Sequence, residues 1–137
     1  MEKRGVFITQ FDLDRLNILV AEKKAAGGDH SYLNDLEEEL RQADIVDSRD
    51  IPANVITMNS KVRIEDVETG EEMVLSLVFP QDADIDEGRI SILAPIGTGM
   101  IGFKEGDLIE WPVPAGVRKI KVLEILYQPE AAGDFNL

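Results

Sequence analysis

Three glycines between residues 97 and 102 form the pattern in this chain that most resembles a cofactor site. The stretch GTGMIG fits G-x-G-x-x-G, a spacing that lets a loop approach the pyrophosphate of a dinucleotide, and it follows an apolar run typical of a strand. Such a site also needs a long helix that begins at the last glycine. Gly106 and Pro112 leave room for only about one helical turn here. The sequence therefore favours a packing role for the glycines, with a short helical turn from Met100 to Phe103 docked closely on a sheet.

The segment DADIDEG, residues 82–88, carries carboxylates at the spacing of a calcium-binding loop. Its three aspartates would fill positions one, three and five of such a loop. The sixth position requires glycine and the twelfth requires glutamate, but this chain has Glu87 and Leu93 there. The segment is therefore predicted to be an exposed acidic turn.

Asp29, His30 and Asp35 lie around a glycine-rich turn and are the remaining chemical candidates. His30 is the only histidine and the chain has no cysteine, which excludes histidine clusters, disulfides and thiol chemistry. The two aspartates could hold Mg²⁺, an ion that takes carboxylate oxygens and keeps several waters. Both also suit the start of a helix, as an N-cap and as a first-turn acid, and capping is the favoured interpretation. His30 is predicted to be a solvated loop residue, and no bound metal is expected.

The segments that would position these residues begin with two helices. Thr9 is placed as an N-cap with Asp12 in the capping-box position, and apolar residues then recur at helical spacing up to the AAGGD stretch. A second helix follows, with Leu33, Leu36 and Leu40 on one face. Two helices of about 15 residues joined by a tight turn predict an antiparallel hairpin about 22 Å long.

The polar segment DSRDIPAN is the predicted boundary between two domains, a helical arm over residues 1–48 and a second domain over 49–137. Beyond it the apolar pattern changes to a period of two, which is typical of strands. No long helix separates these strands, so an antiparallel sheet is predicted, followed by a polar tail. The expected strands cover residues 61–67, 73–79, 88–96, 107–113 and 117–127.

The net charge is −13 and the pI is about 4.4. A chain this acidic should repel free nucleic acid and anionic membranes, since binding to phosphates needs lysine and arginine, whereas a basic protein surface would suit it. The longest uncharged run, residues 90–103, is too short to span a bilayer, and the N-terminus lacks the apolar core of a signal peptide. We therefore expect a cytoplasmic protein. A closed seam between the two predicted helices and a mostly polar exterior indicate a monomer.

The segment GRISILAPIGTGMIGFKEGDLIEW, with QDADIDEG before it, resembles the C-terminal domain of the Gre-type transcript cleavage factors. Those factors carry a similar acidic loop, then I-S-x-x-S-P, I-G-x-x-x-G-D and a final hairpin. VITMNSKVRI, TGEE, LVFP and LYQPEAAGDFNL resemble still more closely the Rnk family, short Gre relatives named as regulators of nucleoside diphosphate kinase. The resemblance covers nearly the whole chain. It implies an α+β fold with a short N-terminal antiparallel helical hairpin of coiled-coil type and an FKBP-like antiparallel β-sheet domain with one short helix.

Gre-type factors dock at the secondary channel of bacterial RNA polymerase, and acids at the tip of their arm help to hold the catalytic Mg²⁺. The arm here is shorter, and its tip lacks the D-L-S-E-N-A-E-Y pattern of those factors. The resemblance thus implies a regulator of transcription that is not an enzyme, needs no cofactor, binds RNA polymerase and competes with longer channel-binding factors. The alternative is a cleavage factor in which Asp29 assists the Mg²⁺. A third hypothesis, contact with a nucleoside diphosphate kinase, rests on the family name.

The docking surface implied by the resemblance is the segment that matches S-P and the turn after it. In this chain alanine replaces the serine of the cleavage factors, which removes a hydroxyl group from that surface. Ile96 and Met100 fit a buried core equally well. The implied docking residues are Ala94, Pro95, Ile96, Gly97 and Thr98, with Met100 nearby.

Overall fold

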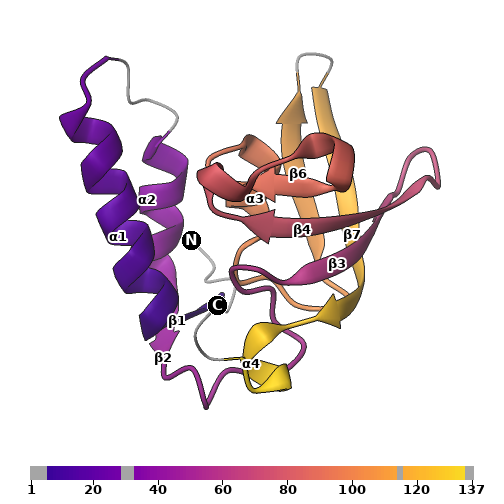
Figure 1. Ribbon diagram of the computed structural model, residues 1–137. Coiled ribbons are helices and arrows are strands. Elements are labelled where there is room, and N and C mark those ends of the chain that lie inside the picture. Colours follow the sequence, from indigo (N-terminus) through magenta and orange to yellow (C-terminus); the bar gives the residue numbers. More distant parts are fainter. Residues whose placement is uncertain (1–5, 29–32, 114–115, 135–137) are drawn as a thin grey trace.

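The structure is a computed structural model that describes residues 6–28, 33–113 and 116–134. It is a mixed α+β fold, with a helical N-terminal part beside a part built on a five-stranded sheet (Figure 1). None of the helices in the described part of the chain has the length and apolar composition that a membrane span requires.

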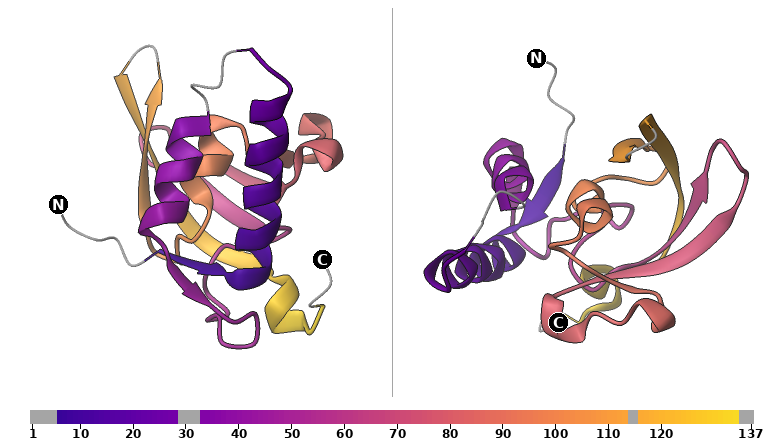
Figure 2. Two further views of the ribbon diagram at one scale, coloured as in Figure 1. Left: turned by 90° about the vertical axis from the view of Figure 1, so that its left-hand side faces the viewer. Right: turned by 90° about the horizontal axis from the view of Figure 1, so that it is seen from above.

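The N-terminal part contains strand β1 (Phe7–Thr9), helix α1 (Gln10–Ala25), helix α2 (Leu33–Gln42) and strand β2 (Asp44–Val46). The two strands pair in parallel below the helices. Both predicted helices are present, but α2 has 10 residues where about 15 were expected. Leu16, Leu19 and Val20 of α1 are buried, as are the three predicted leucines of α2. The helices lie side by side (Figures 1 and 2). The predicted tight turn between them falls on residues 29–32, outside the described residues.

The larger sheet has the strand order β5-β4-β3-β7-β6. The predicted antiparallel pairing is correct for β3–β4, β3–β7 and β6–β7, but β5 pairs with β4 in parallel, so the sheet is mixed. The chain reaches β5 from β4 through two short 3₁₀ turns, η1 (Pro80–Asp82) and η2 (Ile85–Glu87), instead of a hairpin. The strands are β3 (Lys61–Asp66), β4 (Glu72–Val78), β5 (Arg89–Ser91), β6 (Leu108–Val113) and β7 (Gly116–Tyr127).

Two short helices correct the expected ends of strands. The strand predicted over residues 88–96 ends at Ser91, and helix α3 (Pro95–Met100) follows, because proline at the first helical position is already set to a helical φ. The helical turn expected at 100–103 is therefore earlier and longer. The expected polar tail contains helix α4 (Pro129–Ala132), whose first turn is capped by the buried side chain of Gln128.

One hydrophobic core joins the helices to the sheet. Helix α3 contacts α2 on one side and β6 on the other, so it lies between the N-terminal helices and the sheet (Figure 2, right). Leu36 of α2, Met100 of α3 and Ile109 of β6 are all buried in this core. The helices thus pack along the side of the sheet domain, and their apolar stripes are largely occupied by contacts inside the molecule.

Candidate functional site

Most of the side chains expected to form a docking surface are buried. Ile96, Thr98 and Met100 lie in the core, and the Thr98 hydroxyl donates a 2.7 Å hydrogen bond to the carbonyl of Ile92. Helix α3 contacts α2 as well as β5 and β6, which covers these side chains. The sequence left core and surface positions equally open for Ile96 and Met100, and the structure places both in the core, where they position α3. The docking role of the segment stays a prediction. At the start of the helix, Leu93 and Ala94 are half-buried and still reach the surface.

The glycines of the GTGMIG segment serve close packing. A Cβ on Gly97 would lie 2.2 Å from the carbonyl oxygen of Ser91, and one on Gly102 would lie 2.1 Å from Cγ1 of Val6. Gly102 also has a φ of +81°, a left-handed conformation that favours glycine. Gly97 thus allows α3 to dock on the turn after β5, and Gly102 allows the N-terminal strand to dock on the sheet domain. The packing role predicted from the sequence agrees with this geometry.

The acidic turn at residues 82–88 is exposed, as predicted. The carboxylate of Asp84 accepts a hydrogen bond from the N–H of Asp86 at 3.2 Å and lies 3.7 Å from Arg89. Gly88 closes the turn with a φ of +73°. Asp84 is therefore used to shape the turn that leads into β5.

The predicted arm tip is only partly described. Asp29 and His30 lie outside the described residues, and Asp35 lies in the first turn of α2. Within the described ranges, no group of three or more histidine, aspartate or glutamate side chains could hold a metal ion. The roles predicted for the tip residues stay predictions.

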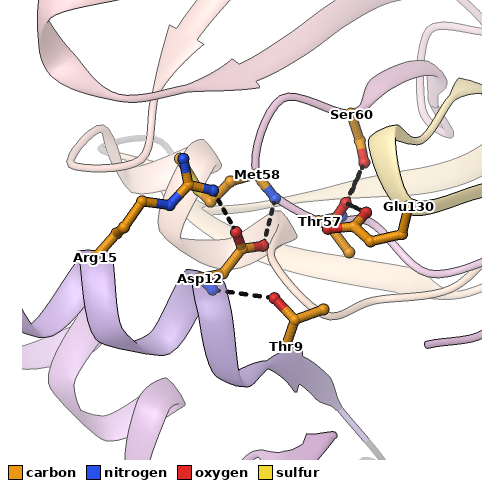
Figure 3. A network of polar contacts seen from close by, with 7 residues as sticks. All are labelled: Thr9, Asp12, Arg15, Thr57, Met58, Ser60 and Glu130. Carbon is orange, nitrogen blue, oxygen red and sulfur yellow. Dashed lines mark hydrogen bonds and ion pairs between the residues drawn. The ribbon is translucent and has the colours of Figure 1, made fainter. Parts of the chain in front are cut away.

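The structure reveals a buried polar network that the sequence patterns did not predict (Figure 3). Asp12 of α1 is 1% exposed, and its carboxylate accepts hydrogen bonds from Arg15 at 2.6 Å and from the backbone N–H of Met58 at 3.1 Å. The Asp12 N–H donates to the hydroxyl of Thr9 at 3.0 Å, which is the predicted N-cap bond. Thr9 thus caps α1 by accepting from the Asp12 N–H, and the Asp12 side chain ties the helix to the sheet domain.

The turn that Asp12 contacts is TMNS, residues 57–60. The Thr57 hydroxyl lies 2.9 Å from the Ser60 hydroxyl and donates to Glu130 of α4 at 2.7 Å. Asn59 takes the left-handed conformation at a φ of +68°, which asparagine tolerates better than most residues. One turn therefore holds both the first helix and the last helix of the chain (Figure 3).

Arg15 extends this contact by stacking. Its guanidinium lies 4.1 Å from the ring centre of Phe11 and 4.8 Å from that of Phe79, at the end of β4. The ion pair with Asp12 holds the guanidinium in place over both rings. The orientation of α1 against the sheet domain thus depends on Asp12, Arg15 and Phe79 together.

Burial raises the pKa of Asp12 above its ordinary value of 3.8, although its hydrogen bonds with Arg15 and Met58 act in the opposite direction. Burial also raises the pKa of Glu130 above 4.5, and the nearby charge of Asp12 adds to this effect. Both carboxyl groups hold a proton more tightly in the folded chain than in the unfolded chain. Their contribution to stability is therefore complete at pH values below their ordinary pKa and is lost as the pH rises through the raised pKa.

The variant Glu130→Gln should remove part of this pH dependence. Glutamine has the shape of the protonated acid and stays neutral, so the variant should gain stability relative to the wild type as the pH rises from about 4 to about 7. Urea midpoints measured across this range test the prediction. The control is Glu110→Gln, on an exposed residue of β6. The prediction is wrong if the two variants differ from the wild type by the same amount at every pH.

Two family models together cover most of the chain. The model of the C-terminal domain of the transcription elongation factors GreA/GreB matches residues 51–127. The model of the Rnk N-terminus matches residues 4–46.

Individual relatives agree with these matches. The chain is 36% identical over 138 residues to the regulator of nucleoside diphosphate kinase of Escherichia coli K12, an alignment that covers 100% of both chains. It is 41% identical over 90 residues to the transcription elongation factor GreA of Clostridium botulinum, which covers 66% of this chain and 56% of that relative. A solved GreA/GreB elongation factor from Nitrosomonas europaea superposes with a TM-score of 0.73 and 40% identity over 91% of this chain and 100% of that one.

Proposed function

The chain belongs to the Rnk family, with the Rnk N-terminus and the GreA/GreB C-terminal domain in one polypeptide, and from this premise we propose that it binds bacterial RNA polymerase at the secondary channel. The Gre-type domain over residues 51–127 carries this proposal. Binding by the same kind of domain would make this chain a competitor of longer channel-binding factors. The net charge of −13 suits a basic site on the partner protein.

We also propose that the chain acts without stimulating transcript cleavage. In this proposal α1 and α2 form an antiparallel helical hairpin beside an FKBP-like domain, and the 2.7 Å ion pair between Lys24 and Glu37 supports their pairing. At about 1.5 Å per residue, the 16 residues of α1 extend over about 24 Å. The apolar faces of both helices belong to the same hydrophobic core as the sheet, and α2 contacts α3, which limits how far the helices can extend away from the sheet domain.

We propose that the turn before α3 is the docking surface, through Leu93 and Ala94. Both side chains are half-buried and lie at the start of a helix whose body is covered by α2. Ala94 is the N-cap of α3 and makes no capping bond with its side chain. Its side chain reaches the surface and also packs against the hydrophobic core.

Competition for purified core RNA polymerase tests the proposed function. The labelled chain should bind with a Kd of about 10 µM or tighter, and unlabelled GreA should displace it. The variant Ala94→Glu should bind at least about tenfold more weakly, because it places a larger, charged side chain in the proposed contact. Its thermal unfolding is measured alongside, since Ala94 also packs against the core, although an acid is tolerated at a helix N-terminus. Failure to bind polymerase would remove the proposal, and binding that GreA does not affect would place the chain elsewhere on the polymerase.

Direct contact with a nucleoside diphosphate kinase is the competing proposal, and it is favoured by the name of the Escherichia coli relative. Gel filtration of the chain with a purified nucleoside diphosphate kinase separates the two. Co-elution with the kinase, together with no binding to polymerase, would favour the kinase.

A further inference from the structure

Half of strand β4 has an open edge. On one side, Glu72 to Ser76 of β4 pair with β3. On the other side, only Ser76, Leu77 and Val78 of β4 pair with β5. Within the described residues, the stretch Glu72–Leu75 therefore has no strand partner on the side away from β3. This stretch belongs to the β3–β4 hairpin, which extends beyond the rest of the sheet (Figure 1).

The hydrogen-bond pattern shows which backbone groups point to the open edge. Leu77 donates its N–H to Ser60, and Glu71 accepts from Asp66, so both face β3. The backbone groups of successive residues alternate in direction along an antiparallel strand, so Met73 and Leu75 also face β3. The N–H and C=O groups of Val74 and Glu72 therefore point to the other side. The Val74 carbonyl oxygen lies close to Gly88 there, since a Cβ on Gly88 would be 3.0 Å from it, which leaves the Val74 N–H and the groups of Glu72 at the open edge. Ser76 follows the same alternation, because its N–H donates to Gly88 on that side at 2.7 Å.

A groove of about 500 Å³ runs along this edge, between β4 and the turn η2. Its apolar lining comes from β4 and from Ile85 in η2, and Ile85 is 79% exposed while Val74 is 42% exposed. Proteins seldom leave exposed apolar side chains next to an open strand edge, because an edge of this kind can pair with another chain.

The charge along the groove indicates the chemistry of the partner. Asp86 and Glu87 line it, with Lys61 as the one cation among its lining residues. Residues 82–89 include two further acids, Asp82 and Asp84, which makes four acids in this segment. The one arginine of the segment lies beside Asp84. A second copy of this chain, with a charge of −13, would be repelled. A segment with lysine or arginine between apolar residues would match both the acids and the apolar lining.

We propose that the open edge of β4 binds an extended, basic segment of a partner polypeptide by strand addition. The backbone groups of Glu72 and the N–H of Val74 bind the backbone of the partner, the groove takes its apolar side chains, and the acids of η2 bind its cations. This site is separate from the turn before α3, and it does not depend on which protein that turn binds.

Proline at position 74 tests the backbone contact directly. Val74→Pro removes an N–H that points away from β3, so the ladder between β3 and β4 keeps its bonds. Val74→Thr is the matched control, because threonine keeps both the N–H and the β-branched shape. The probe is a fluorescent peptide of about ten residues that alternates lysine and valine, which is long enough for a strand.

We expect saturable binding of this peptide to the wild type and to Val74→Thr, and at least about tenfold weaker binding to Val74→Pro. The peptide should also slow hydrogen exchange at the amides of Glu72 and Val74. No saturable binding to the wild type, or equal binding to the proline and threonine variants, would overturn the proposal. Circular dichroism establishes whether Val74→Pro is folded.

A charge variant keeps the proposal testable if the proline variant does not fold. The double variant Asp86→Asn, Glu87→Gln should bind the peptide several-fold more weakly and with a smaller dependence on salt, since it removes two charges that attract the lysines. Glu110→Gln, on the opposite edge of the sheet, should bind like the wild type. Equal affinity for the double variant and this control would contradict the proposal.

Discussion

Replacing Asp12 with alanine should lower the free energy of unfolding by about 3 kcal/mol, because the variant leaves a buried backbone donor without its acceptor. The Met58 N–H donates to the Asp12 carboxylate across 46 positions of sequence. An orphaned buried N–H alone costs about 1–3 kcal/mol. The variant also removes the ion pair that holds Arg15 over Phe11 and Phe79. A loss of about 3 kcal/mol is a large part of the 5–15 kcal/mol typical of a domain.

Two further variants distinguish the contribution of this network to stability from the general effect of a substitution in α1. Asp12→Asn keeps one acceptor oxygen and should lose about 1–2 kcal/mol. Asp14→Ala removes an exposed carboxylate on the same helix, bonded only to Gln10 in the described hydrogen bonds, and should change stability by less than about 0.5 kcal/mol. Urea unfolding gives all three values. A loss for Asp12→Ala equal to that of Asp14→Ala would show that the network contributes nothing.

The same variant links stability to the proposed function. If Asp12 holds α1 against the sheet domain, hydrogen exchange at the Met58 amide and across α1 should accelerate in Asp12→Ala more than exchange in β7, which lies between two strands. The docking turn at Leu93 and Ala94 belongs to the sheet domain. Polymerase binding through that turn should therefore survive under conditions in which the variant is still folded.

The helices and most strands were predictable because their signals are local. The spacing of Leu33, Leu36 and Leu40 defines one face of a helix without reference to the rest of the chain. In β3 every second residue is buried, which is the local pattern expected of a strand, whereas β4 changes from exposed to buried along its length. The N-cap at Thr9 was predictable for the same reason, since the cap and its partner are three residues apart.

The errors and the questions that the sequence left open concern features that depend on distant residues. The sequence could not decide whether Ile96 and Met100 are exposed, because this depends in part on α2, which contacts α3 and lies more than 50 residues earlier in the chain. The parallel pairing of β5 depends on the path of the chain through η1 and η2, which has no periodic pattern. Asp12 was predicted as a cap, but nothing near it in the sequence points to Met58. The TMNS turn and the PEAA segment were conspicuous in the sequence, and the structure shows that both belong to one polar network.

The second large effect concerns the glycines of α3, where alanine at two nearby positions should have opposite results. Gly97→Ala should lower the free energy of unfolding by at least about 3 kcal/mol, because the new Cβ would lie 2.2 Å from the carbonyl oxygen of Ser91 and 3.2 Å from Cα of Ile92. These are backbone atoms, so the contact cannot be relieved by turning a side chain. Either α3 moves away from the turn after β5, or that turn distorts.

Gly99→Ala is the matched control on the same helix. Its Cβ would lie 3.6 Å from Cγ2 of Ile109, an ordinary contact. Neither glycine has a left-handed φ, so alanine suits the backbone at both positions. At position 99 the higher helix propensity of alanine should leave stability unchanged or raise it by up to about 1 kcal/mol.

The difference between the two variants measures how closely α3 docks. Both changes add one methyl group to the same short helix, so the effect of helix propensity is the same in the two variants. The difference in their stability therefore reports how much space surrounds each methyl group. Thermal and urea unfolding of both variants give the difference directly. If Gly97→Ala were as stable as Gly99→Ala, α3 would not be held against the turn at Ser91, and the packing explanation of the G-x-G-x-x-G pattern would be wrong.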